Sequence, residues 1–308
     1  MTTSSGPAGG DDPMRDLPIA EPPQRISGMR LPESWRLPGK PADLDPAADD
    51  AWRQTGFQLA EELRLLQEGL ELQLAMARTG YTPGARTMTM AAFASLWSRA
   101  FLSSTDVVAL VRKADYQGAT ALVRQVVEFV GAQANLGHEL DSWRRWAHEA
   151  YTRDEATRAT AVGVGHYFGG EAIAADEHLR VIYRAASDFA RPNFGPTALF
   201  VAGDASHERY PLIFADQAFH LGWAQLLLGW LLRVGVTQLH VAMHLAPQFP
   251  APPELRERVV AHAAAVERLL ASSDRCRVEE VEDADRRRRH LLRDFRRQSA
   301  DAPRRLLL

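Results

Sequence analysis

The side chains best suited to chemistry lie in the stretch YRAASDFARPN, residues 183–193. On a helix, Arg184, Ser187 and Arg191 follow one another at steps of three and four, so they share one face. Guanidinium groups placed in this way bind phosphate or carboxylate through paired hydrogen bonds. A proline ends the helix just before Asn193. The alternative interpretation is a solvated helix end with no ligand.

A second polar stripe precedes it on an otherwise apolar segment, ATALVRQVVEFVGAQANL, where Thr120, Arg124 and Glu128 are four residues apart. Two interpretations remain open. Arg124 and Glu128 pair only with each other, which on a helix surface contributes a few tenths of a kcal/mol. Alternatively the stripe lines an internal cleft, because a buried charge needs a partner. The second interpretation predicts a polar groove built from Arg124, Glu128, Arg184, Ser187, Arg191 and Asn193.

The order Tyr-Arg-x-x-Ser, a cation, Pro and Asn resembles the signature of an uncharacterised all-helical bacterial family. Its members read Arg, Ser and His-Pro-Asn, after a helix with an Arg-x-x-x-Glu stripe like Arg124 and Glu128. That family in turn resembles HEPN-like domains, whose RNase members use an Arg, four to six residues, and a His. The resemblance covers about residues 90–240. Arg184 matches the Arg, and Arg191 stands where the His would be.

This difference at Arg191 determines the functional prediction. Imidazole exchanges a proton near neutral pH, whereas guanidinium stays charged and cannot act as a general base. We therefore expect no catalytic residue, and a non-catalytic HEPN-like module that binds a nucleotide, RNA or a protein partner, with a homodimer as one arrangement. One alternative is a metal-independent RNase in which His178 or His207 supplies the imidazole. Another is a structural or assembly protein that forms an oligomer through an exposed apolar surface.

Other kinds of site find little support in the sequence. His240 and His244 have helical spacing, but no His-Glu-x-x-His and no Glu-x-x-His occurs, so we expect no metal. The glycines of residues 163–170 do not form a dinucleotide-binding or phosphate-loop motif, so we expect no cofactor. Cys276 is the single cysteine and lies in a charged segment without an evident catalytic partner.

The elements that must position these residues are predicted to be helices. Apolar residues recur at helical spacing in most of the chain, and strands do not alternate with helices. The exception is TALFVA and RYPLIF, which fit a short hairpin around Gly203 and Asp204. The fold class is therefore mostly α, a multi-helix bundle. Helices are expected at about 51–79, 88–113, 119–136, 138–152, 172–190 and 253–271, and a helix or a helix pair at 214–246. The helix at 88–113 is either continuous or interrupted at 103–106.

The composition predicts three regions. Residues 1–46 are rich in Pro, Gly, Asp and Ser and are expected to be disordered. Residues 47–272 form the helical bundle domain. Residues 273–308 form a charged, Arg-rich C-terminal helix or tail, because Glu282 and Arg286 start a series of i,i+4 ion pairs. The alternative for this tail is an arm that contacts RNA through phosphate groups.

The net charge of −3 and the 46% of hydrophobic residues are ordinary for a soluble protein. A single cysteine and a first segment without a secretory signal predict a cytoplasmic protein. The apolar stretch at 214–246 is interrupted by polar residues such as Gln225, Arg233 and Gln238. We therefore expect a central helix there and no membrane span.

Overall fold

The protein is mostly helical, as predicted, in the part of the chain that the computed structural model describes, which comprises residues 29–80, 88–138, 169–203, 205–206 and 208–307. The helices are α1 (Pro46–Gln58), α2 (Ala60–Thr79), α3 (Met88–Arg112), α4 (Tyr116–His138), α6 (Gly170–Ala175), α7 (Glu177–Ala190), α8 (Phe194–Val201), α9 (Leu221–His244) and α10 (Pro253–Leu270). The strands are β1 (Arg277–Glu282), β2 (Arg288–Phe295) and β3 (Arg304–Leu307).

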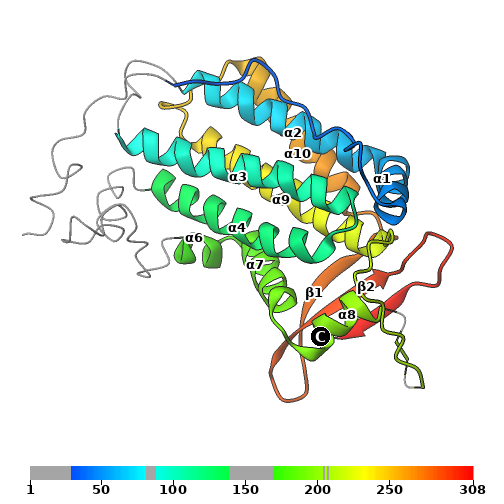
Figure 1. Ribbon diagram of the computed structural model, residues 1–308. Coiled ribbons are helices and arrows are strands. Elements are labelled where there is room, and N and C mark those ends of the chain that lie inside the picture. Colours follow the sequence, from blue (N-terminus) through cyan, green and yellow to red (C-terminus); the bar gives the residue numbers. More distant parts are fainter. Residues whose placement is uncertain (1–28, 81–87, 139–168, 204, 207, 308) are drawn as a thin grey trace, which may run out of the picture.

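Short capping sequences fix where the helices begin. Asp45 accepts hydrogen bonds from the N–H groups of Ala47 and Ala48, and Pro46 occupies the first turn of α1. Between α3 and α4 the chain turns at Ala114, whose φ is +58°, and Asp115 then accepts from the N–H of Gly118 at 3.0 Å. Such local signals place α3 and α4 side by side as an antiparallel pair (Figure 1).

The centre of the molecule is α9, which contacts α2, α3, α4, α7, α10 and the first two strands. Most of its residues are buried, with Trp223, Leu227 and Leu228 nearly inaccessible. Among the described residues it is the one helix long and apolar enough to cross a membrane, yet 67% of its most apolar window is buried inside the protein. This degree of burial is what a core helix shows.

Residues 29–45 differ from the prediction of disorder, because they lie as an ordered strap along α2 and α3 (Figure 1). Gln67 of α2 donates to the carbonyl of Trp35 at 2.7 Å and accepts from the N–H of Leu37 at 2.8 Å. The Trp35 ring meets the Phe101 ring of α3 edge-on, with centroids 5.2 Å apart. A few aromatic and backbone contacts thus order a segment whose average composition is polar.

Two further predictions are wrong in the region from 170 to 220. The single helix expected at 172–190 is broken at Asp176, whose carboxylate caps α7 by accepting from the N–H of Leu179 at 2.9 Å. The hairpin expected from TALFVA and RYPLIF is wrong, because Phe194–Val201 forms α8. One backbone hydrogen bond, from Ile213 to Val201 at 2.7 Å, joins the two segments.

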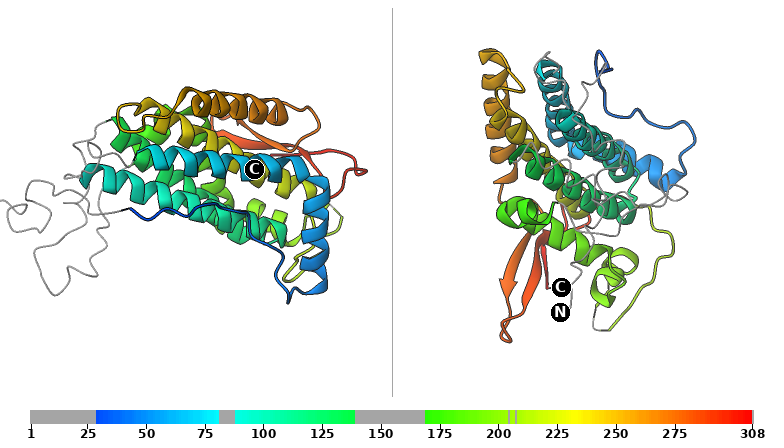
Figure 2. Two further views of the ribbon diagram at one scale, coloured as in Figure 1. Left: turned by 90° about the horizontal axis from the view of Figure 1, so that it is seen from above. Right: turned by 90° about the vertical axis from the view of Figure 1, so that its left-hand side faces the viewer.

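The prediction of a C-terminal helix is also wrong. The described residues after Ser273 contain an antiparallel sheet of order β1-β2-β3. The charges expected to pair along a helix pair within the sheet instead: Arg289 with Asp283 at 3.0 Å and Arg277 with Asp294 at 3.0 Å. Figures 1 and 2 show the sheet with α7 and α8 on one side of the long helices. Through Leu292 and Phe295 it joins the main core.

A buried ion pair ties the start of this sheet to α2. Arg275 pairs with Glu62, and their side chains are 7% and 5% exposed. Arg275 also donates to the carbonyl of Gln225 on α9 at 3.3 Å, while the side chain of Gln225 accepts from the N–H of Cys276 at 3.0 Å. Three elements distant in sequence are therefore joined at one point.

Three predicted features lie wholly or partly outside the described residues. They are the disorder predicted for residues 1–28, the helix at 138–152 beyond His138, and the glycine-containing loop at 163–170, of which only the last two residues are described.

Candidate functional site

The residues of the predicted polar groove lie on α4, on α7 and in the connection between α7 and α8. Arg124 and Glu128 form an i,i+4 pair on α4 with 3.2 Å between Nη2 and Oε1. The Arg124 guanidinium also lies 5.6 Å from the centre of the Tyr183 ring on α7. Helices α4 and α7 therefore meet at this point, as the predicted groove requires. The contact with Arg124 is made by the ring of Tyr183, which is not one of the predicted groove residues.

Arg184 is directed to the sheet. Its Nη1 lies 3.0 Å from Oε1 of Glu280 on β1, with the two side chains 41% and 21% exposed. Burial acts to raise the pKa of Glu280, but the hydrogen bond and charge of Arg184 outweigh it, so that the pKa lies below its usual value. The structure thus pairs Arg184 with Glu280, a partner that the sequence did not predict.

The remaining groove residues lie at the end of α7 and beyond. Ser187 is buried, and its hydroxyl has no hydrogen-bond partner among the described residues. Arg191 is exposed and lies 3.4 Å from Asp188, which is also 3.0 Å from Nδ1 of His290 on β2. Asn193 is exposed and precedes α8 without capping it through its side chain. The six residues therefore face different surroundings.

A site that the sequence analysis missed lies where α9 begins. The side chain of His220 caps this helix, because its Nδ1 accepts from the N–H of Trp223 at 3.3 Å. The backbone N–H of His220 donates to the hydroxyl of Tyr116, the first residue of α4, at 2.9 Å. The imidazole is 8% exposed and packs on Phe295 with the ring centres 4.4 Å apart.

This geometry determines the protonation of His220. Burial first, and then the charge of Arg297, lower its pKa to about 3, so the ring is neutral at physiological pH. Since Nδ1 accepts a hydrogen bond, the single ring proton is on Nε2. His220 lines two cavities, and it shares both with Arg297.

The first cavity, which we call the arginine cavity, has a volume of 390 Å³. Its charged lining comprises three arginines and one carboxylate. The Nε atoms of Arg296 and Arg297 are buried and have no acceptor among the described residues. Unpaired buried donors indicate that an acceptor is missing. The polar lining residues are His220, Arg296, Arg297, Gln298, Asp301 and Arg304.

The second cavity, which we call the amide cavity, has a volume of 380 Å³ and shares His220 and Arg297 with the first. Arg297 lies at the boundary and pairs with Asp216 at 3.3 Å. The amide cavity combines the amides of Gln117 and Gln217 with aromatic rings of Phe200 and Trp223, which stack on each other at 4.5 Å. Gln117 and Phe200 also line a third cavity of 350 Å³ that reaches Arg191.

The arrangement is suited to binding rather than to proton transfer. A histidine with a pKa near 3 is too weak a base to accept a proton near neutral pH, and its Nδ1 lone pair already accepts the N–H of Trp223. Burial raises the pKa of the Tyr116 phenol, so it too stays protonated. Arginines beside a fixed N–H donor form instead a receptor for anionic oxygen atoms.

The histidines named in the sequence analysis and Cys276 form no second centre within the described residues. His178 is exposed on α7 and its pKa is lowered by burial and by the charge of Arg233, while His207 lies outside the described residues. His240 and His244 are exposed, and no group of three potential metal ligands occurs within the described ranges. Burial raises the pKa of Cys276 to about 12, which leaves the thiol unreactive.

A sequence signal for this site existed but was weak. FHLGW places a histidine directly before an apolar helix, the position of a capping residue, and DFRRQSADAPRR brings the arginines. Nothing in the spacing shows that two segments separated by more than seventy residues meet. No family model matches the chain, and no curated protein and no solved structure matches it.

Proposed function

We propose that this protein is a non-catalytic binding module for a phosphate-bearing ligand of nucleotide size. The observation that carries the proposal is the pair of cavities that share His220 and Arg297, together with the buried Nε atoms of Arg296 and Arg297, which have no acceptor among the described residues. The resemblance to HEPN-like domains and the helical bundle architecture are part of the same proposal and rest on the sequence alone.

The two cavities suit different parts of a nucleotide. The arginine cavity, with Arg297 and Arg304, suits phosphate oxygen atoms, because guanidinium binds them through two parallel hydrogen bonds. The amide cavity suits a base, since Gln117 and Gln217 offer both donors and acceptors and Phe200 offers an aromatic surface. Each cavity lies within the size range of small-molecule sites.

Isothermal titration of the full chain with adenosine and guanosine monophosphates, the nucleosides and inorganic phosphate tests this proposal. We expect a monophosphate to bind, and Arg304→Ala to weaken it by about ten- to a hundredfold, the contribution of a charge-assisted hydrogen bond. Arg305→Ala is the matched control, because Arg305 is the exposed neighbour on β3 and does not line the cavity. Equal affinities for nucleoside and nucleotide would contradict the proposal.

His220→Asn tests the donor separately. Asparagine is a good N-cap, so α9 keeps its start while the Nε2 proton is lost. We expect weaker nucleotide binding with an intact thermal transition. A labelled single-stranded RNA serves as a competitor. If RNA binds and mononucleotides do not, the ligand is a polymer and the proposal of a small ligand is contradicted.

A metal-independent RNase is the second candidate function, and one contact favours it. Nδ1 of His290 lies 3.0 Å from Asp188, one helical turn after Arg184, so an imidazole is near the position that the HEPN resemblance requires. Cleavage of labelled RNA in the presence of a chelator, lost in His290→Ala and Arg184→Ala, would support this function. Absence of cleavage by the unmodified chain would remove it.

A further inference from the structure

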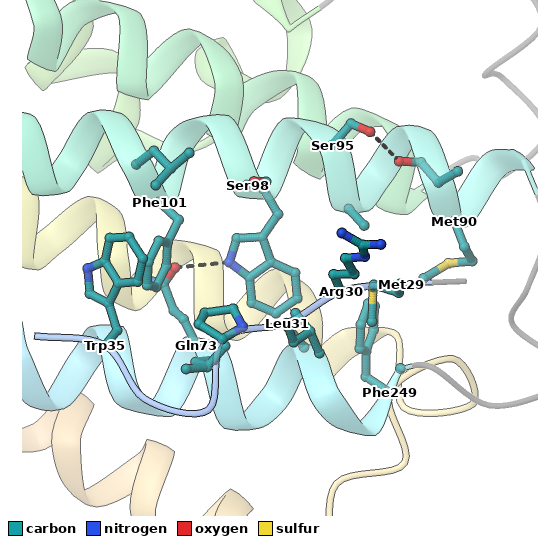
Figure 3. A pocket seen from close by; sticks show the side chains of 18 residues that line it. Met29, Arg30, Leu31, Trp35, Gln73, Met90, Ser95, Ser98, Phe101 and Phe249 are labelled. Carbon is teal, nitrogen blue, oxygen red and sulfur yellow. Dashed lines mark hydrogen bonds between the residues drawn. The ribbon is translucent and has the colours of Figure 1, made fainter. Parts of the chain in front are cut away.

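A cavity of 390 Å³ lies between the strap, α2 and α3, on other elements than the site above (Figure 3). Its wall is mostly aromatic and aliphatic, with rings from Trp35, Trp97, Phe101 and Phe249. Figure 3 shows these rings distributed along the length of the cavity, with Trp35 and Phe101 at one end and Phe249 near the other. We call this the strap cavity.

The way the strap is attached leaves room beneath it. Gln67 reaches the strap backbone at Trp35 and Leu37 with its side-chain amide, at 2.7 and 2.8 Å. Arg78 donates from its guanidinium to the carbonyl groups of Pro32 and Glu33. Long side chains of α2 thus hold the strap backbone along one side of the cavity.

Several polar groups in this wall already have partners. The indole N–H of Trp97 donates to Gln73 at 2.9 Å, and the hydroxyl of Ser95 donates to the carbonyl of Ala91 at 2.7 Å. The indole N–H of Trp35 donates to Thr105 at 3.3 Å. Water in such a cavity finds few hydrogen-bond partners, so an apolar group occupies it more favourably.

One charge lies at the edge of this apolar space. Arg30 is exposed, and it is the charged member of the cavity lining, which contains no carboxylate among the described residues. Figure 3 shows its guanidinium between Ser95 and Phe249. The lining is therefore complementary to a ligand with an apolar body and a single negative charge.

We propose that the strap cavity binds an amphipathic monocarboxylate, an aliphatic acid of medium length, with its chain among the aromatic rings and its carboxylate on Arg30. This inference is independent of the nucleotide site, because the two share no lining residue. The volume lies within the range of small-molecule sites.

Titration of the full chain with decanoate, decanol and decyltrimethylammonium tests the proposal, by calorimetry and by the fluorescence of Trp35 and Trp97. We expect decanoate to bind one equivalent, about tenfold or more tightly than decanol, from one charge-assisted hydrogen bond. Arg30→Ala is expected to reduce decanoate to the affinity of decanol. Arg36→Ala is the control, because Arg36 is exposed on the same strap but does not line the cavity.

Two further variants block the cavity. Ala94→Phe fills it from α3, and Ser98→Leu, at an exposed lining position, narrows it where folding is least affected. Both are expected to lose decanoate binding, with the thermal transition recorded for each. Three results would overturn the proposal: no binding by the full chain, as when another part of the chain fills the cavity; equal affinity for decanoate and decanol; or binding unchanged in a folded Ser98→Leu.

Discussion

His220 illustrates at the scale of one residue how a fold can fix a protonation state. Its Nδ1 is used by the helix that it caps, its ring is buried against Phe295, and Arg297 lies beside it. Each of these contacts disfavours the imidazolium form, so the pKa falls to about 3. The free energy of unfolding therefore decreases when the solution becomes acidic.

This shift predicts a pH dependence of stability. In the unfolded chain the imidazole of His220 has its ordinary pKa of about 6.5, so it binds a proton below that pH, whereas the folded state does not until about pH 3. Stability is therefore lost as the pH falls from about 6.5. From pH 7 to pH 5 this amounts to about 2 kcal/mol.

Urea unfolding at several pH values checks this prediction. The free energy of unfolding of His220→Asn is expected to fall by about 2 kcal/mol less than that of the unmodified protein between pH 7 and pH 5. His244→Asn, which changes an exposed histidine of the same helix, is the control. Parallel curves for His220→Asn and the unmodified protein would show that the ring is protonated when folded.

The candidate sites were only partly predictable at this scale. The Arg124–Glu128 pair followed from i,i+4 spacing, because helix geometry fixes that distance locally. The contacts of Arg184 with Glu280 and of His220 with Tyr116 join elements about a hundred residues apart. No local pattern contains such information, since it arises when the sheet and the helices pack.

At the scale of elements, the C-terminal sheet shows why a charge pattern misled. An i,i+4 ion pair contributes only a few tenths of a kcal/mol, whereas the burial of a large apolar side chain contributes about 1.5–3 kcal/mol. Leu292 and Phe295 are fully buried in the sheet. The burial of these two side chains therefore outweighs the helical ion pairs. In β2, buried residues alternate with half-buried ones, and the register shifts after Leu292.

The buried pair of Glu62 and Arg275 is expected to hold this sheet on the helices. Glu62→Gln leaves a buried guanidinium without a counter-charge and should lower the free energy of unfolding by about 3–5 kcal/mol. The control is Glu61→Gln, because Glu61 pairs with Arg64 on the surface and such pairs contribute up to about 1 kcal/mol. Chemical denaturation followed by tryptophan fluorescence measures both, and equal effects would contradict the prediction.

At the scale of the whole molecule, most long helices were predicted from the spacing of apolar residues, and the mostly helical class with them. The strap and the sheet were not, because each depends on a few contacts with distant residues. The break at Asp176 was missed although its signal is local, since Asp176 caps α7 through the N–H of Leu179. The average composition of a segment does not show that one residue, Trp35, holds it against the helices through its contact with Phe101.

Among the described residues, exposed large apolar side chains are concentrated around α8 and the segment that follows it. Phe194 of α8 stacks on Tyr210, and Leu212, Ile213 and Phe214 follow, with Phe214 93% exposed. Clusters of this kind mark contact surfaces in soluble proteins. These residues belong to one short stretch of chain and its neighbouring helix, and we call them the α8 surface.

We expect this surface to support self-association that depends on concentration. Leu212→Ser combined with Phe214→Ser should weaken it by about tenfold or more, since each apolar side chain contributes more than 1 kcal/mol when buried. Sedimentation velocity over a range of concentrations measures the effect. Phe57→Ser, which changes an isolated exposed ring on α1, is the control. A protein that stays monomeric at all concentrations would exclude a homodimer through this surface.

The contact between Glu62 and Arg275 joins residues separated by 213 positions, and this has a consequence during synthesis. While the ribosome is still producing the chain, the carboxylate on α2 has no counter-charge and stays hydrated. The surrounding helices can then close fully only after the last part of the protein has left the exit tunnel. Chains that terminate prematurely, before residue 275, should therefore remain open and become substrates for chaperones and proteases.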